Sequence, residues 1–440
     1  MANFISNLIK NHILKKIKFR ITRIKNSFFK IKRKSKIIDY DFFLKRVYLL
    51  RKRILLFRFR IKYGKLYITH KKICWINTPN INYILKVNKD KYYYYLRILK
   101  GDWDKNISDF KSSLFHKAFN QRFNESKNWE DTIYYQTLLN MINNGIIIAR
   151  AKNKEELDKT FRFYDLLYNN IKKNFYISFF DSKFSKKLID FWEIVNNISV
   201  YIDRYGRFLI IDGRHRVSIA KILNIPKIPA IIIARHEAWI NFRRNLLYFF
   251  KKYQRGKLYQ PLMHPDLLDL PFNYSGLSFD TIMKNISSSQ GKLLDIRANL
   301  GYFCHKFEDE GFDCYAVEPN PMHVYFMKKL KKAENKQFKI IPQSIFEYSK
   351  GKDLVFDVVL ALNGFNEYLK NEQARINLIN FLKSLRIKEL FLGISKPRGI
   401  KRNYSIDQSL NLVIENSCLN EVKLIERLKD GRYIYIFTAN

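Results

Sequence analysis

The sequence predicts a multidomain α/β protein, and three observations lead to this fold class. The chain has 440 residues, more than one hydrophobic core usually serves. Hydrophobic residues make up 47% and aromatic residues 16% of it, which is typical of folded rather than disordered chains. From Lys292 onward, short apolar runs alternate with helix-compatible stretches, which is typical of a parallel sheet covered by helices. We therefore expect several modules, the last of them an α/β domain.

Positive charge is concentrated near the N-terminus. The formal net charge is +41, and residues 1–65 hold 21 Lys and Arg against two acids. Such an excess favours a phosphate-bearing partner or an anionic membrane face. The chain also prefers Lys, Ile, Asn, Tyr and Phe, as AT-rich genomes do, so codon bias explains part of the charge equally well.

Residues 1–65 read as a basic, amphipathic helical segment, because apolar residues recur between basic ones. Three interpretations are open for it: contact with anionic lipid, packing of its apolar stripe against the rest of the protein, or nucleic-acid binding. No run of 18 uncharged apolar residues and no signal-peptide pattern occurs. We expect a cytoplasmic protein, with peripheral membrane contact as the alternative.

No metal site is expected from the cysteine pattern. Cys74, Cys304, Cys314 and Cys418 are scattered, without a CxxC pair or a His cluster at zinc spacing. Residues 66–180 are expected to form a mixed α+β domain, beginning with the strand-like runs 66–69 and 73–76. This range contains a Gly-Asp-Trp-Asp stretch at 101–104, and it shows no catalytic constellation.

The range 181–256 is expected to form an α+β middle domain with an anion site. The apolar run 208–211 is followed by Asp212, Gly213, Arg214, His215 and Arg216, which open an apolar-periodic helix. A strand, a glycine turn and a helix N-terminus favour a phosphate, because the free N–H groups and the helix dipole point toward it. The basic side chains add charge-assisted donors. The sequence thus predicts that residues 212–216 bind a phosphate or nucleotide.

This pattern resembles the ParB and sulfiredoxin-like superfamily over residues 185–235. Gly213, His215, Arg216 and Ala220 fall on the family's pattern, and the resemblance implies nucleotide or phosphate binding. There is no cysteine at the turn, which disfavours sulfinic acid reduction. The alternative is that Arg and His side chains only tie the turn to neighbouring carboxylates.

Residues 257–440 are expected to form the last domain. The strand 293–296 leads through a tight turn into a helix over 302–310, which Gly311 ends, and the strand 314–317 closes on Glu318. An acidic residue about 20 positions after such a turn is placed to accept the hydroxyls of a ribose. Further strands are expected at 338–341, 356–362 and 390–394, and a terminal antiparallel hairpin at 422–425 and 433–437.

Five strand and helix units followed by a hairpin resemble the class I methyltransferase fold, a Rossmann-like sheet, over residues 275–440. The family's Asp-x-Gly-x-x-x-Gly motif corresponds to residues 295–301 here. The resemblance implies S-adenosylmethionine as cofactor. Arg297 replaces the first glycine of the motif, where its side chain would either block the cofactor or bind its carboxylate. The implied contacts are Asp295, Ala298, Asn299 and Gly301 at the methionine moiety, Glu318 at the ribose, Gln343 and Ser344 near the adenine, and Asn363 facing the acceptor.

The function expected from these features is S-adenosylmethionine-dependent methyl transfer to a phosphate-bearing or glycan acceptor. This acceptor could be a glycan or lipid-linked sugar, a nucleotide derivative, or nucleic acid. Alignment of the reactants is the main requirement of such a displacement. His323 and Glu367 are candidate bases for a hydroxyl acceptor, but no catalytic residue is assigned. The alternative is a protein that binds nucleic acid or a nucleotide and carries a non-catalytic Rossmann domain.

Overall fold

A computed structural model describes most of the chain after residue 73. The chain divides into two compact units, residues 1–64 and 65–440, and the account below concerns the second. The basic helical segment expected over 1–65 and the strand expected at 66–69 lie outside the described residues. The described ranges are 74–86, 97–149, 151–174, 198–253, 257–272, 279–362, 364–369, 371–395, 405–429 and 431–439.

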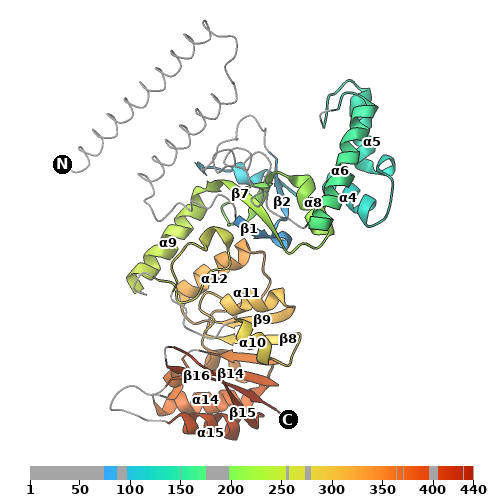
Figure 1. The fold of residues 1–440 in the computed structure, drawn as a ribbon. Coiled ribbons are helices and arrows are strands. Elements are labelled where there is room, and N and C mark those ends of the chain that lie inside the picture. Colours follow the sequence, from blue (N-terminus) through green and yellow to red (C-terminus); the bar gives the residue numbers. More distant parts are fainter. Residues whose placement is uncertain are drawn as a thin grey trace, which may run out of the picture. The chain divides into compact units, whose positions relative to one another are not determined.

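A seven-stranded mixed sheet forms the first half of the described structure (Figure 1). Its order is β1-β7-β5-β6-β2-β4, and β3 pairs with β7. The long strand β7 lies in its interior because its residues from Ile228 on are almost continuously apolar and buried. The ranges 66–180 and 181–256, expected as separate domains, both contribute strands to this sheet. The strands are β1 Cys74–Asn77, β2 Tyr83–Leu85, β3 Arg97–Leu99, β4 Ile107–Asp109, β5 Ile198–Ile202, β6 Phe208–Asp212 and β7 Lys227–His236.

Helices rich in aromatic residues accompany this sheet. The helix α6 begins with two acids and ends with two lysines, the arrangement that the helix dipole favours. Thr132 caps α5 by accepting a hydrogen bond from the backbone N–H of Tyr135 at 3.3 Å. The helices are α4 Leu114–Phe123, α5 Ile133–Asn143, α6 Lys154–Asn174, α8 Arg214–Ile222 and α9 Glu237–Tyr253, with 3-10 turns at Thr78–Asn80, Trp103–Lys105 and Trp129–Asp131.

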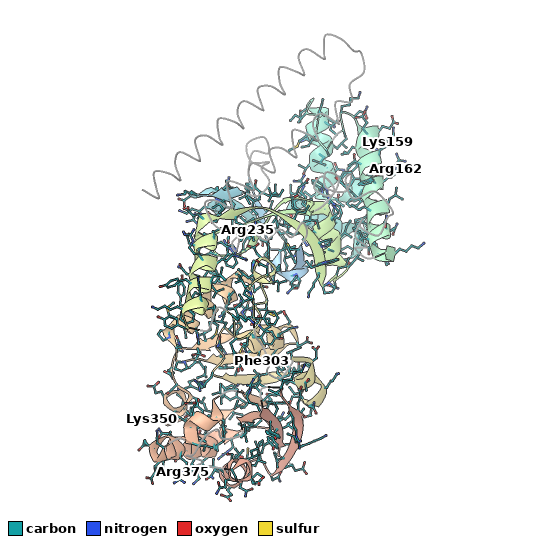
Figure 2. The ribbon with its side chains drawn as sticks, turned by 60° about the vertical axis from the view of Figure 1, so that its left-hand side comes forward. Lys159, Arg162, Arg235, Phe303, Lys350 and Arg375 are labelled. Atoms are coloured by element: carbon teal, nitrogen blue, oxygen red, sulfur yellow. The ribbon has the colours of Figure 1, made fainter. Side chains whose placement is uncertain are left out.

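The connector 257–272 packs against the mixed sheet through a buried ion pair. Arg235, on β7 and labelled in Figure 2, donates from Nε to both carboxylate oxygens of Asp266 at 2.9 Å. Trp239 Nε1 donates to the same carboxylate at 3.0 Å. Leu258, Leu262 and other connector residues belong to the same hydrophobic core as the mixed sheet. This segment therefore connects the two halves of the unit rather than belonging to the C-terminal domain alone.

The C-terminal sheet, yellow to red in Figure 1, has the strand order expected of a doubly wound domain. Its first five strands lie in the order third, second, first, fourth, fifth and are parallel. The antiparallel pair β15 and β16 follows, with β16 next to the fifth strand. This confirms the Rossmann-like sheet and its terminal hairpin. The strands are β8 Gly291–Ile296, β9 Phe312–Val317, β10 Lys339–Ile341, β12 Val358–Ala361, β14 Glu389–Ser395, β15 Glu421–Arg427 and β16 Arg432–Thr438, and a separate pair is β11 Leu354–Val355 with β13 Leu385–Arg386.

Helices cover both faces of this sheet. Leu293 and Leu294 are neighbours on β8, and they belong to different hydrophobic cores because successive side chains of a strand point to opposite faces. The core at Leu293 takes side chains from α10 and α11, and the core at Leu294 takes them from α13, α14 and α15. The helices are α10 Phe279–Asn285, α11 Tyr302–Asp309, α12 Pro321–Ala333, α13 Ile345–Ser349, α14 Glu372–Ser384 and α15 Ile406–Asn416.

Membrane-spanning helices and metal sites were sought among the described residues alone. Within that part of the chain, no helix has the length and apolar character needed to cross a bilayer. Over the same residues, no group of three or more His, Cys, Asp or Glu side chains is placed to bind a metal ion. The four cysteines do not form disulfide bonds with one another.

Candidate functional site

Two corners of the molecule share the pattern of strand, aspartate, turn, glycine and helix. The first, which we call the β6–α8 corner, comprises residues 212–216; the second, the β8–α11 corner, comprises residues 295–301. In each, a glycine in the left-handed region immediately precedes the helix: Gly213 has φ 82° and Gly301 has φ 79°. Both are sites where an L side chain is strained. These corners contain the phosphate site and the first cofactor motif expected from the sequence.

The β8–α11 corner is a tightly bonded loop at the carboxyl end of the first parallel strand. The Ala298 N–H donates to Val317 O at 3.1 Å, and the Gly301 N–H donates to Ala298 O at 2.9 Å. Arg297 and Asn299 have φ values of 58° and 57°, a region that non-glycine residues seldom enter. These N–H groups are thus used within the protein, and the loop is held close to the end of β9.

Glu318 links this loop to the second strand. Its Oε2 accepts a hydrogen bond from the Asn299 N–H at 2.8 Å, and its Oε1 accepts one from the Asn320 N–H at 3.0 Å. The side chain is buried. A carboxylate has about four acceptor positions, so both oxygens retain capacity for the hydroxyls of a ligand. His323, at the start of α12, places Nδ1 3.3 Å from Glu318 Oε1.

Asp295, at the end of β8, is a buried carboxylate with an unsatisfied oxygen. Its Oδ2 has no hydrogen-bond partner among the described residues. Burial raises the pKa of Asp295 well above its usual value, and the nearby charge of Glu318 raises this pKa further. An unpartnered buried acceptor is rare in proteins and calls for a ligand, an ion or a water molecule. A ligand ammonium group is the partner that would compensate this carboxylate.

Arg297 extends toward the fourth strand, on the opposite side of β8 from Glu318. A Cβ atom built on Gly364 would overlap its guanidinium group, so the arginine lies against the loop after β12. In the sheet, β12 and β9 flank β8 on opposite sides. The Arg297 side chain is exposed. It therefore leans toward Gly364, while Glu318, where the sequence predicts the ribose, follows the strand on the other side of β8.

Tyr368 is a site residue that the sequence analysis missed. It lies on the 3-10 helix Phe365–Leu369, and its ring contacts that of Phe346 with centroids 4.8 Å apart. Burial raises the pKa of Tyr368, the charge of Arg297 lowers it, and the charge of Glu318 raises it. The hydroxyl therefore senses both charged groups of the corner. The only signal in the sequence was the Asn-Gly dipeptide at 363–364, which is typical of a turn.

The remaining residues expected from the sequence to contact the cofactor or the acceptor follow the third and fourth strands. Gln343 is half-buried in the loop after β10. Ser344 begins α13 with a capping box: its Oγ accepts from the Glu347 N–H at 3.2 Å, and the Glu347 carboxylate accepts from the Ser344 N–H at 3.0 Å. Asn363 lies outside the described residues. Glu367, the second candidate base, is exposed beside Tyr368.

Two side chains of the β6–α8 corner, those of Arg214 and His215, lie against aromatic rings. The His215 ring stacks on Phe119 with centroids 5.5 Å apart and 7° between the planes, and it lies 4.5 Å from the ring of Tyr164. Arg214 lies 5.0 Å over the ring of Phe115. These rings come from α4 and α6, 50 or more residues away in sequence. The Asp212 carboxylate accepts a hydrogen bond from the Gly213 N–H at 2.9 Å. Arg216 is half-buried.

No protein-family model and no curated protein matches the sequence. Similar solved structures include a protein from Pyrococcus horikoshii, 11% identical over 37% of this chain and 87% of that chain, with a TM-score of 0.30. They also include the bifunctional kinase-methyltransferase WbdD, 14% identical over 44% of this chain and 46% of that chain, with a TM-score of 0.36. A third is the N-methyltransferase NodS from Bradyrhizobium japonicum, 15% identical over 36% of this chain and 92% of that chain, with a TM-score of 0.30. The chain thus spans less than half of WbdD, and our assignment of the fold depends on the strand order rather than on these likenesses.

Proposed function

We propose that this protein is an S-adenosylmethionine-dependent methyltransferase whose cofactor binds at the β8–α11 corner. The single observation that carries the proposal is that two carboxylates lie at the carboxyl ends of adjacent parallel strands. These are Glu318 and the buried Asp295, whose Oδ2 has no partner among the described residues. Ligands of doubly wound domains bind at this edge of the sheet. An adenosyl group with an amino-acid tail carries both a ribose diol and an ammonium group, which suit these two carboxylates.

Each residue of the corner has a distinct part in this proposal. Glu318 accepts the ribose hydroxyls, and Asp295 compensates the ammonium group of the methionine moiety. Arg297, which lies against Gly364, donates to the carboxylate of the same moiety. Gln343 and Ser344 lie near the adenine. When bound, the cofactor supplies an electrophilic methyl group, and the chain's contribution is to align it with an acceptor and to exclude water.

The proposed acceptor is a phosphate-bearing or glycan molecule.

The middle module is proposed to be ParB-like. The support for this is the glycine turn at the start of α8, which Gly213 permits with its left-handed backbone. A nucleic-acid-binding protein with a non-catalytic Rossmann domain is the competing function. Arg297 at the glycine position of the motif is the feature that favours this alternative.

Calorimetry with S-adenosylmethionine tests the proposal. Glu318→Gln keeps the size of the side chain but removes the charge that we place on the ribose. Asp313→Asn, at the other end of the same strand, is the matched control, because Asp313 is exposed and pairs with Lys339 at 3.2 Å. We expect saturable binding by the unmodified protein, at least about tenfold weaker binding by Glu318→Gln, and no change with Asp313→Asn.

Two results would contradict the proposal. One is the absence of any saturable binding by the unmodified protein together with no competition by S-adenosylhomocysteine. The other is binding that Glu318→Gln leaves unchanged, which would place the ligand elsewhere. The competing function predicts nucleic-acid binding that weakens steeply with salt, and it is eliminated if no such binding occurs at low salt.

A further inference from the structure

A basic cavity lies where the end of α12 meets the mixed sheet, away from both corners. It has a volume of about 550 Å³, and its walls include Tyr83 on β2, Arg207 just before β6, and lysines from the end of α12 onward. A volume of roughly 300 to 1,000 Å³ is typical of sites for small molecules. The cavity is thus large enough for a small ligand.

The walls of this cavity are fixed by tight packing. The Asn80 side chain donates to Glu334 Oε2 at 2.8 Å. A Cβ atom on Gly206 would come within 2.6 Å of the Ala333 Cβ, so α12 and the loop before β6 are in close contact. Phe326 and Leu330 of α12 belong to the same hydrophobic core as the mixed sheet. The cavity is therefore a preorganised feature of this unit, which limits the ordering that a ligand must impose.

The charge of the lining is positive and only partly compensated. Its basic residues are Arg207, Lys328, Lys331, Lys332 and Lys336, and among the described residues no carboxylate lines it. Arg207 Nε pairs with Asp203 at 2.7 Å, and Lys336 pairs with Asp309. The other three lysines have no carboxylate within ion-pair distance among the described residues. Three ammonium groups without anionic partners make a site for a compact, multiply charged anion.

Two tyrosine rings, that of Tyr83 in the lining and that of Tyr205 beside Arg207 and Lys332, are already in contact with cations. The Arg207 guanidinium lies 4.4 Å from the centroid of the Tyr83 ring, and the Lys332 ammonium lies 3.5 Å from that of Tyr205. Single-stranded nucleic acids need aromatic faces on which bases stack. Because these rings are engaged by cations, the arrangement favours phosphate groups without stacked bases.

We propose that this cavity binds a small ligand that carries two or more linked phosphate groups. Lys328, Lys331 and Lys332 supply the charge-assisted donors, and Arg207, just before β6, adds a guanidinium group to the lining. The site is distinct from the proposed cofactor site. Glu318 lies before the first residue of α12, whereas Lys328, Lys331 and Lys332 lie on the second half of this 13-residue helix. The proposal therefore goes beyond methyl transfer and does not depend on it.

Calorimetry of the full chain with inorganic pyrophosphate tests this proposal. Lys331→Gln/Lys332→Gln removes two charges from the last turn of α12. Lys251→Gln/Lys252→Gln removes two charges from the last turn of α9, outside the cavity, and is the matched control for net charge and for the helix dipole. Lys331→Arg/Lys332→Arg keeps the charge. Residues 1–65 are unchanged in every variant, so any binding there is common to all.

We expect saturable pyrophosphate binding that weakens at least about tenfold in Lys331→Gln/Lys332→Gln. The α9 pair and the arginine pair should bind like the unmodified protein. All variants should keep the affinity for S-adenosylmethionine of the unmodified protein, so failure of this proposal and failure of the methyltransferase proposal are distinguishable.

Three outcomes overturn the proposal. The first is no saturable binding of pyrophosphate by the unmodified protein. The second is equal weakening in the α12 and α9 glutamine pairs, which would indicate a response to net charge alone. The third is oligouridylate binding that Lys331→Gln/Lys332→Gln abolishes and that pyrophosphate does not displace, which would make the cavity part of a nucleic-acid surface.

Discussion

The β6–α8 corner and the β8–α11 corner have the same local design but use their polar groups differently. In the first, the Asp212 carboxylate accepts from its own turn, and His215 is stacked among aromatic rings. In the second, Asp295 Oδ2 is buried without a partner among the described residues, and Arg297 is exposed. Similar sequence patterns therefore lead to one corner whose histidine is packed among aromatic rings and one whose aspartate keeps a buried oxygen without a partner among the described residues.

This difference shows that a turn motif alone does not identify a binding site. Both corners have a left-handed glycine and the positive end of a helix dipole. What separates them is whether the polar atoms already have partners in the fold. A buried acceptor without a partner destabilises the folded chain by about 1 to 3 kcal/mol, and such a cost is typical of sites that a ligand completes.

The largest expected difference is between the losses of stability caused by replacing each of the two glycines with alanine. Gly213→Ala would place its Cβ 2.9 Å from the Ile198 Cα, whereas Gly301→Ala would meet the flexible Met327 side chain at 3.1 Å. We expect Gly213→Ala to lower the free energy of unfolding by about 3 kcal/mol and Gly301→Ala by about 1 kcal/mol. Urea unfolding of both variants measures this. Equal losses would show that the two turns are equally constrained.

A second comparison concerns the basic side chains that follow each strand, His215 after β6 and Arg297 after β8. His215→Ala removes a ring from the aromatic cluster and leaves a cavity, so we expect a loss of about 2 kcal/mol in the free energy of unfolding. Arg297→Ala truncates an exposed side chain and should change it by less than about 0.5 kcal/mol. Thermal unfolding compares the two directly. A larger loss in Arg297→Ala than in His215→Ala would reverse our assignment of the corners.

The smallest expected effect is a pH-dependent change in the free energy of unfolding when Asp295, or its counterpart Asp212, is replaced by asparagine. Because the pKa of Asp295 is raised in the folded state, the folded protein loses stability as the pH rises from the unfolded value of about 3.9 toward the folded value. Asp295→Asn removes this loss, so relative to the unmodified protein it should gain about 1 kcal/mol at pH 8 and less at pH 5.

Asp212→Asn is the matched control for this experiment. It weakens the hydrogen bond that the Asp212 carboxylate accepts from the Gly213 N–H, so no gain at pH 8 is expected. Unfolding midpoints at pH 5 and pH 8 test both variants. A stability difference between Asp295→Asn and the unmodified protein that does not change with pH would show that Asp295 is ionised throughout.

Local patterns in the sequence were sufficient for much of the fold. The alternation of apolar runs and glycine turns from Lys292 onward predicted the parallel strands, and Glu318 was placed correctly at the end of the second of them. The left-handed caps at Gly213 and Gly301 also follow from local turn chemistry. These features depend on neighbours within about 30 residues, which a sequence pattern can reveal.

Contacts between distant segments could not be predicted in this way. The stack of His215 on Phe119 joins residues 96 positions apart, and Asp104 pairs with Arg204 across 100 positions. Nothing in the Gly-Asp-Trp-Asp stretch indicated that its second aspartate would be a buried partner of this arginine. Tyr368 belongs to the proposed cofactor site for the same reason, because the order of the strands brings its loop beside Arg297.

A crystal structure of the full chain with S-adenosylhomocysteine would test the central claim most directly. Our account predicts that the ribose hydroxyls contact Glu318, that the ammonium group lies beside Asp295, and that Arg297 contacts the ligand carboxylate. Ligand density at residues 212–216, or none at the β8–α11 corner under saturating ligand, would contradict it.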